Sequence, residues 1–386
     1  MGAERNHPSQ KAALPYPTPA IITDAMSEIK YSFIIPVYNR PEEVKELLES
    51  LVHQTEASQS RPRKMDDVEI VVVEDGSQNR CEDEVNLYKD KLNISYYFKD
   101  NSGPGPSRNA GAARAKGEYL IFLDSDVVLP PRYLASLDTA LARHPVDAFG
   151  GPDKAHSSFT PTQKAISYAM TSFFTTGGIR GGKKKMDKFY PRSFNMGIRA
   201  DVYQALGGFS RMRFGEDIDL SIRIFKGGYK CRLIPEAWVW HKRRTDFRKF
   251  WRQVFNSGIA RINLYKKYPE SLKVVHLLPM VFTLGVFFLM ILIILGLAAF
   301  LFCPSHMIAA FGFACVEIGV APLLLFSLLI FADASIRNKS AWIGLLSVRA
   351  AFTQLTGYGC GFLKAWWHRC VMGKGEMQAY RKNFYK

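Results

Sequence analysis

The chain has 386 residues, enough for one large domain with an appendage or for two domains. It carries 51 Lys and Arg against 35 Asp and Glu, a net charge of +16 that suits a nucleic acid, an anionic membrane or a phosphorylated substrate. No zinc-finger spacing, RNA-binding motif or basic heptad accompanies the charge, and much of it flanks apolar segments. We therefore expect the chain to associate with a membrane and not to bind nucleic acid. The six scattered cysteines form no CxxC pair, which suits a reducing compartment.

The first part of the chain alternates strand-like and helix-like runs. Residues 1–29 are polar and proline-rich, without a signal peptide's apolar segment, and predict a disordered tail. Pro41 opens a helix, and an alanine-rich helix is expected from Arg108 to Ala115. This alternation predicts an α/β fold with a mainly parallel sheet flanked by helices, which binds ligands at the carboxyl ends of its strands. The expected strands are Tyr31–Val37, Glu69–Val73, Ile94–Phe98 and Tyr119–Leu123.

Acidic residues stand where these strands end. Asp124 and Asp126 follow the fourth strand, one residue apart, and two such carboxylates can hold one hard divalent cation. The alternative is a helix-capping Asp in a surface turn, and the pattern alone leaves both open. Asp75 follows the second strand and could accept a base N–H or a ribose hydroxyl. The glycine-rich turn from Asn101 into a helix suits a nucleotide.

Five motifs, taken together and in order, are similar to those of family-2 glycosyltransferases. The resemblance covers roughly residues 31–245 and carries more weight than any one motif. The motifs are Ile34-Ile35-Pro36-Val37-Tyr38-Asn39, Val73-Glu74-Asp75-Gly76-Ser77, Asn101-Ser102-Gly103 with Arg108-Asn109 and Gly111, Leu123-Asp124-Ser125-Asp126, and the run from Asn195-Met196-Gly197 through Gly215-Glu216-Asp217 to Trp240-His241.

The resemblance implies a GT-A fold, a nucleotide diphosphate sugar as donor, and Mn²⁺ or Mg²⁺ as cofactor. Uracil is the base that the family favours. The residues that it implies for the donor are Pro36, Tyr38, Asn39, Asp75, Arg108 and Asp124. The implied metal ligands are Asp126, Asp124 and His241, although a His in this place is, without the resemblance, more often structural.

Glu216 and Asp217 match the acidic pair of the family, in which one carboxylate acts as general base. Direct displacement inverts the anomeric carbon and requires removal of the acceptor hydroxyl's proton. We assign Asp217 as the base and Glu216 as its support. The alternative is an acidic first turn of a helix over Ile218–Phe225, stabilised by the helix dipole, and both can hold at once.

The second part of the chain is apolar. Residues 274–303 and 308–332 are each long enough to span a bilayer, and Pro304-Ser305-His306 leaves room only for a tight hairpin. Basic residues flank the pair, which places both ends in the cytoplasm at an inner membrane. Residues 341–367 contain Arg and Lys and are expected to form an interfacial helix, followed by a basic tail. Glu317 lies within the second span without an assigned role.

These segments predict three regions. They are a tail over 1–29, a GT-A domain over 30–265 and a membrane region over 266–386. The basic loop Gly177–Lys185 could close over phosphates, although such a run is more often a solvated loop.

The stretch of chain after the acidic pair narrows the function. The Gln-x-x-Arg-Trp motif of processive synthases is absent there, so we expect one sugar per encounter. The expected acceptor is a lipid-linked oligosaccharide in surface polysaccharide assembly, with a polyprenyl phosphate as the alternative. A nucleotidyltransferase is disfavoured because Pro36–Asn39 stands where a glycine-rich basic loop would be. A catalytically inactive membrane scaffold remains the alternative of another class.

Overall fold

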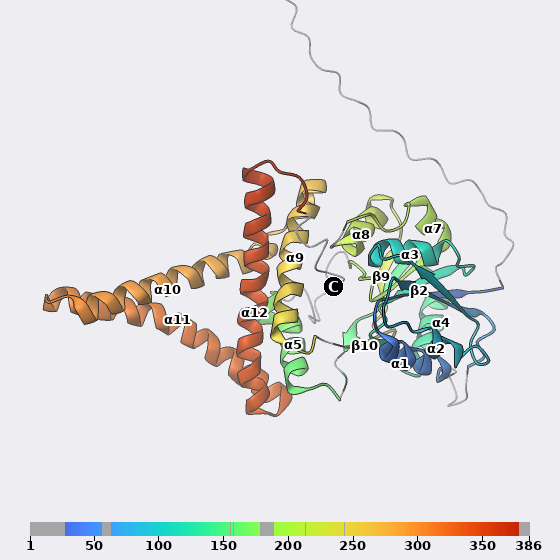
Figure 1. Cartoon of the computed structure of the whole chain (residues 1–386), viewed down its shortest axis with the longest axis horizontal. Coiled ribbons are helices and arrows are strands. Elements are labelled where there is room, and N and C mark those ends of the chain that lie inside the picture. Colours follow the sequence, from blue (N-terminus) through green and yellow to red (C-terminus); the bar gives the residue numbers. More distant parts are fainter. Residues whose placement is uncertain are drawn as a thin grey trace, which may run out of the picture.

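The computed structural model describes residues 28–55, 63–154, 156, 158–177, 189–212, 214–242 and 244–377. Most of the expected tail, the basic loop after Gly177 and the last residues of the basic tail lie outside the described residues. Figure 1 shows an α/β domain at one end, upright helices beside it, and a two-helix hairpin that projects away from both.

The α/β domain is built on a sheet of seven strands in the order β3-β2-β1-β4-β8-β6-β9. Strands β3, β2, β1 and β4 are parallel, β8 is antiparallel to both its neighbours, and β6 and β9 are parallel. The predicted, mainly parallel sheet is confirmed. The strands are β1 Tyr31–Val37, β2 Val68–Asp75, β3 Ile94–Lys99, β4 Tyr119–Leu123, β6 Ala148–Gly150, β8 Asn195–Arg199 and β9 Cys231–Leu233.

The bounds of two predicted elements differ in ways that matter for the site. Strand β2 runs on to Asp75, so this residue ends the strand rather than following it. Helix α3 spans Pro104–Ala112 and begins four residues earlier than predicted. Pro104 suits the first helical position, and Gly103 before it has a φ of 97°, which only glycine adopts easily. The glycine-rich turn is therefore shorter than the sequence suggested.

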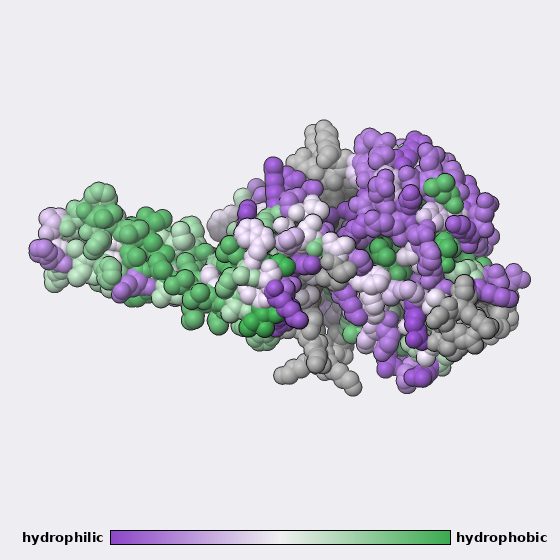
Figure 2. Space-filling view, turned by 90° about the horizontal axis from the view of Figure 1, so that it is seen from below, coloured by the Kyte–Doolittle hydropathy of each residue, from purple (hydrophilic) through white to green (hydrophobic). Residues whose placement is uncertain are grey.

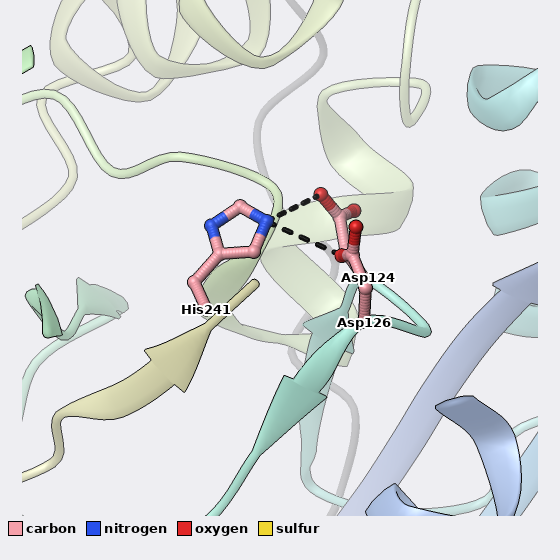
Figure 3. A group of neighbouring side chains, drawn as sticks. All are labelled: Asp124, Asp126 and His241. Carbon is pink, nitrogen blue, oxygen red and sulfur yellow. Dashed lines mark ion pairs between the residues drawn. The ribbon is translucent and has the colours of Figure 1, made fainter. Parts of the chain in front are cut away.

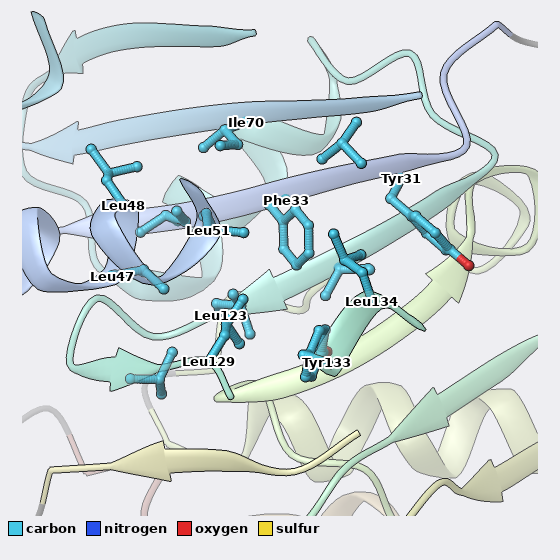
Figure 4. Packing of buried hydrophobic residues seen from close by; sticks show 14 of the residues in the cluster. Tyr31, Phe33, Leu47, Leu48, Leu51, Ile70, Leu123, Leu129, Tyr133 and Leu134 are labelled. Carbon is cyan, nitrogen blue, oxygen red and sulfur yellow. The ribbon is translucent and has the colours of Figure 1, made fainter. Parts of the chain in front are cut away.

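Helices cover both faces of the sheet. Leu47, Leu48 and Leu51 of α1 pack against Phe33 and its neighbours in a fully buried core (Figure 4). Burying such side chains provides most of the stabilisation, roughly 1.5–3 kcal/mol for each. A second core lies on the opposite face. The helices of the domain are α1 Pro41–Val52, α2 Glu82–Asn86, α3, α4 Tyr133–Arg143, α7 Ala200–Ala205 and α8 Glu216–Lys226.

A small second sheet brings two distant segments together. It consists of β5 Val127–Val128, β10 Val239–His241 and β7 Asp153–Lys154, in the order β5-β10-β7. Strands β5 and β10 are antiparallel, and His241 pairs with Val127. This register places His241 beside the turn that carries Asp124 and Asp126.

Three helices form the upright layer in Figure 1: α5 Pro161–Thr171, α9 Phe247–Lys267 and α12 Ala341–Trp366. Glycines let α9 and α12 approach closely, because a Cβ on Gly258 would lie 2.2 Å from the Tyr358 carbonyl oxygen and one on Gly361 would lie 2.0 Å from that of Phe255. Helices α5 and α9 thus pack against α12, although the predicted boundary at 265 placed them in the other region. The short helices α6 Phe173–Thr176, η1 Pro269–Ser271, η2 Val274–His276 and η3 Trp367–Val371 connect these elements.

The hairpin consists of α10 Leu278–Phe302 and α11 His306–Asn338. Both helices are long and apolar enough to cross a membrane, and the most apolar 18 residues of the two spans have mean hydropathies of 3.0 and 2.3. Only 6% and 11% of these two stretches are buried, whereas the core helix of a soluble domain is mostly buried. Figure 2 shows this apolar surface on the projecting arm, set apart from the hydrophilic α/β domain. Helix α11 runs six residues past the predicted end of its span, and Asp333 in this extension accepts a hydrogen bond from Tyr168 of α5.

Candidate active site

Asp124, Asp126 and His241 form a compact group at the carboxyl end of β4. His241 Nε2 lies 3.2 Å from Asp126 Oδ1 and 4.0 Å from Asp124 Oδ2, and both side chains point toward the imidazole in Figure 3. One potential ligand atom from each residue lies within 4.8 Å of the other two. The turn between β4 and β5 presents the two aspartates, so neither caps a helix. The structure thus brings together the three predicted ligands.

Cationic side chains balance the charge of these carboxylates. Arg40 pairs with Asp126, and Arg108 Nη2 lies 2.7 Å from Asp124 Oδ1. Burial acts to raise the pKa of Asp126, but the charges of His241 and the nearby arginines outweigh burial and hold that pKa well below its usual range. Asp126 is therefore an ionised carboxylate across the physiological pH range.

The donor atoms of the group fit a divalent cation. Two carboxylates and one imidazole suit Mn²⁺, while Mg²⁺ prefers oxygen ligands and retains several waters. His241 Nε2 faces the carboxylates, and its buried Nδ1 has no hydrogen-bond partner among the described residues. The ring of Phe194 packs against the imidazole, with centroids 4.9 Å apart, and fixes its plane. The group could thus hold a divalent cation, and the role of these three residues as metal ligands stays a prediction.

Arg108 connects the metal group to the acidic pair. Its guanidinium is buried, with Nη2 on Asp124 and Nη1 3.1 Å from Glu216 Oε1. Burial and the charge of Asp217 raise the pKa of Glu216 to about 7, although Arg108 opposes the rise. Glu216 is therefore partly protonated near neutral pH. The predicted contact of Arg108 with a donor base stays a prediction.

Asp217 lies in the first turn of α8, as Glu216 and Asp219 do, so the acidic first turn is present together with the proposed catalytic pair. Asp217 Oδ2 lies 3.2 Å from Arg192 Nη1, and its side chain is 15% exposed. Asp219 is instead fully buried and contacts Arg223, Lys267 and Tyr268. Of these three acids, Glu216 and Asp217 line the cavity described below, and Asp219 does not.

The predicted donor residues divide into two sets. Pro36, Tyr38 and Asp75 line the cavity. Asp75 also holds the glycine-rich turn, because its carboxylate accepts the N–H groups of Ser102 at 2.9 Å and Gly103 at 2.8 Å. Its contact with a base stays a prediction.

Asn39 does not line this cavity. Its side-chain oxygen accepts the backbone N–H groups of Gln78 and Asn79, each at 2.9 Å. It thus joins the turn after β1 to the turn after β2. A direct role of Asn39 in donor binding stays a prediction.

A cavity of about 1260 Å³ joins these residues to the upright helices. Its polar end holds Asp124, Asp126, His241 and the acidic pair. Its other end lies against α9, α10 and α12. Such a volume exceeds what a nucleotide sugar alone requires, since pockets for small ligands measure roughly 300–1,000 Å³.

Two residues of the site were missed from the sequence. Arg40 pairs with Asp126, and its position directly after the Pro36–Asn39 motif was the available signal. Arg192 contacts Asp217 and precedes the Asn195 motif by three residues, with nothing in its immediate sequence to mark it. Both arginines line the cavity.

Comparisons with known proteins agree with this geometry. Residues 32–207 match the family model "Glycosyl transferase family 2". A validoxylamine A glucosyltransferase of Streptomyces hygroscopicus subsp. jinggangensis is 27% identical over 234 residues, which cover 54% of this chain and 54% of that relative. The chain thus spans about half the length of that curated relative. A poly(ribitol-phosphate) beta-glucosyltransferase of Bacillus spizizenii is 40% identical over 101 residues, 25% of this chain and 15% of the relative.

Among solved structures, the mannosyltransferase PcManGT of Pyrobaculum calidifontis, in complex with GDP-Man and Mn²⁺, superimposes with a TM-score of 0.53. The match covers 91% of both chains at 16% sequence identity and shows the shared fold. The similarity therefore extends beyond the α/β domain along most of the chain. The match to the family model and the order of the motifs show that residues 32–207 are a glycosyltransferase domain of family 2.

Proposed function

We propose that the chain is an inverting glycosyltransferase that moves one sugar from a nucleotide diphosphate sugar onto a lipid-linked acceptor at the cytoplasmic face of a membrane. One observation carries the proposal: a single cavity connects the Asp124, Asp126 and His241 group to helices that adjoin an apolar hairpin. Mn²⁺ is the favoured cofactor, because the group combines an imidazole with two carboxylates.

The residues of the chain divide the work of the transfer. Asp124, Asp126 and His241 would hold the cation, which when bound neutralises charge on the departing diphosphate. Arg40 and Arg108, already beside these carboxylates, add positive charge at the same end of the cavity. Electrostatic stabilisation of this kind is often the largest contribution to catalysis.

Asp217 is proposed to accept the proton of the attacking acceptor hydroxyl. It lines the cavity, and its contact with Arg192 orients its carboxylate. Glu216, whose pKa is about 7, lies next to it and ties the pair to Arg108. A carboxylate on the face opposite the leaving group leads to inversion at the anomeric carbon.

The lipid character of the acceptor is supported by the hairpin. Helices α10 and α11 each contain an apolar stretch long enough to cross a membrane, and α10 contributes Leu278, Pro279 and Phe282 to the cavity. An acceptor held in a bilayer would thus reach the metal group without leaving the membrane surface. The processive motif is absent after the acidic pair, which supports transfer of one sugar per encounter.

Sugar transfer tests the proposal directly. Full-length protein in detergent would be given UDP- and GDP-sugars with Mn²⁺, and either a bacterial lipid extract or water-soluble glycosides as acceptors. We expect a labelled lipid product with inverted anomeric configuration, and no product from Asp217→Asn. Turnover only on water-soluble acceptors would contradict the lipid acceptor. Absence of turnover, together with absence of nucleotide binding, would support an inactive scaffold. Transfer onto a prenyl phosphate itself would identify the polyprenyl-phosphate alternative.

A further inference from the structure

One acidic residue of the hairpin, Glu317 of α11, faces away from α10. A Cβ on Gly312 would lie 2.6 Å from the Gly296 carbonyl oxygen of α10. One on Gly319 would lie 2.5 Å from Ile293 Cγ1, so both glycines face α10. At 3.6 residues per turn, positions two and five residues away lie on nearly the opposite side of a helix. Glu317 is therefore on the outer side of α11, where it is exposed, and no residue that the structure describes makes a hydrogen bond or ion pair with it.

Glu317 lies at the middle depth of the hairpin. It follows His306, the first residue of α11, by 11 positions, which is roughly 16 Å at 1.5 Å per residue. The hydrocarbon core of a bilayer is about 30 Å thick, so an inserted hairpin holds this side chain near the centre of the membrane. Helix α10 contains no Asp, Glu, Lys or Arg that could pair with it. A polar group in hydrocarbon is costly unless another polar group bonds to it, so Glu317 indicates a partner from outside the chain.

The surface around Glu317, which we call the outer face, suits a second helix. Residues three, four and seven positions from Glu317 share its side of α11. They are Ala310, Phe313, Ala314, Val320, Ala321 and Leu324. Three of the six are alanines, which let two helix backbones approach closely, while Phe313 and Leu324 are 50% and 55% exposed. Membrane helices associate through small residues and interhelical hydrogen bonds of this kind, because lipid provides no hydrophobic driving force between them.

A second copy of this chain meets the requirements of the outer face. Two copies whose hairpins insert in the same direction present Glu317 at the same depth. A twofold axis along the membrane normal then brings the two carboxyl groups together. A protonated carboxyl group both donates and accepts hydrogen bonds, so it is complementary to a second copy of itself.

We propose that two copies of the chain associate in the membrane through the outer face of α11, with Glu317 of each copy hydrogen-bonded to the partner's Glu317. The inference goes beyond the proposed function, since it needs the hairpin in a bilayer but no particular donor, acceptor or reaction. No residue of α11 lines the cavity, so the association leaves the cavity of each copy free.

Energy transfer between donor-labelled and acceptor-labelled copies tests the inference. Full-length protein labelled at its N-terminal amine is reconstituted into phosphatidylcholine vesicles, and dilution with lipid gives the dissociation constant of the pair. We expect the wild type to associate and Glu317→Leu to associate about tenfold more weakly, because an interhelical hydrogen bond is lost. Glu317→Gln should associate nearly as the wild type does, since an amide also donates and accepts.

Two leucine variants of α11 provide a matched control. Leu324 and Leu329 are 55% and 45% exposed, but only Leu324 belongs to the outer face. Leu324→Ala should therefore weaken the association, and Leu329→Ala should leave it unchanged.

Several outcomes would overturn the inference. They are a wild type that stays monomeric at every ratio of protein to lipid, Glu317→Leu that associates as tightly as the wild type, and equal effects of the two leucine variants. Circular dichroism of each variant in the same vesicles checks that it is folded. Sugar transfer measured on these vesicles tests the proposed function separately. Association without transfer would contradict the transferase and leave the contact between copies intact, whereas transfer by a strictly monomeric wild type would contradict only the contact.

Discussion

Asp126 and Asp219 are both shielded carboxylates beside cationic side chains, yet they belong to different kinds of site. Asp219 is fully buried, and Arg223, Lys267 and Tyr268 contact its two oxygens. Asp126 is 12% exposed, has Arg40 on one oxygen and His241 on the other, and borders the cavity. A carboxylate whose two oxygens are both bonded by buried protein groups has a structural role. A carboxylate that lies beside an imidazole and borders a cavity can bind a metal ion.

Among the acids that border the cavity, Asp217 of the proposed catalytic pair is expected to give the largest effect on sugar transfer. Asp217→Asn keeps the shape of the side chain but removes its basicity, so we expect transfer to fall by about 10³-fold. Mn²⁺-dependent nucleotide binding should remain, because Asp217 contacts Arg192 and no proposed ligand of the metal. Initial rates and calorimetry on the same protein separate the two effects. Loss of both sugar transfer and nucleotide binding would instead assign Asp217 to donor binding.

Asp219, the acid that the protein surrounds completely, is expected to give the largest effect on stability. Asp219→Asn leaves Arg223 and Lys267 without a counter-charge, and breaking a buried ion pair costs on the order of 3 kcal/mol in the free energy of unfolding. Denaturant titration would measure this loss. Because Asp219 ties α8 to the end of α9, a stability equal to wild type would mean that the contacts are replaceable and the comparison is wrong.

Glu216 gives a pH-dependent test. Its pKa of about 7 in the folded protein exceeds the ordinary value of 4.5, so the folded state favours the protonated form. This stabilisation is complete below about pH 4.5 and is lost as the pH rises through 7, by up to roughly 3 kcal/mol. Unfolding measured from pH 4 to 8 should therefore show this decline in the wild type and a flatter profile in Glu216→Gln. Parallel profiles would contradict the raised pKa.

Asp75 lies between the two cases and gives the smallest expected effect. Its carboxylate is bonded within the protein, like that of Asp219, yet it borders the cavity, like that of Asp126. Asp75→Asn should weaken nucleotide binding by about tenfold, the loss of roughly one hydrogen bond to a charged group. Calorimetry with and without Mn²⁺ measures it. An unchanged affinity would assign Asp75 solely to holding the glycine-rich turn.

Much of the sheet and the acidic ends of its strands could be predicted from the sequence. Strands β1 and β4 are buried runs with sharp polar ends, so their bounds were predicted without error, and Asp124 and Asp126 stood out at the end of β4. Helix α3 was misplaced because the weight given to its alanines hid the signal of Pro104. Strand β10 has three residues, too few for any periodicity, so only the family resemblance pointed to His241.

The rest of the cavity depends on contacts distant in sequence. Helices α9 and α12 both line the cavity although they are far apart in the sequence, and glycines such as Gly258 and Gly361 decide how closely these helices approach. Arg192 reaches Asp217 across 25 positions. No local pattern records such pairings, so the sequence predicted the catalytic end of the cavity and missed the end beside the hairpin.

The central claim is that Asp124, Asp126 and His241 hold a divalent cation that binds the donor diphosphate. Calorimetric titration of UDP and GDP into detergent-purified protein, with and without Mn²⁺, tests it most directly in the wild type, Asp126→Ala and Asp219→Asn. We predict Mn²⁺-dependent binding of one nucleotide, lost in Asp126→Ala and kept in folded Asp219→Asn. Binding that is independent of Mn²⁺, or that survives in Asp126→Ala, would contradict the claim.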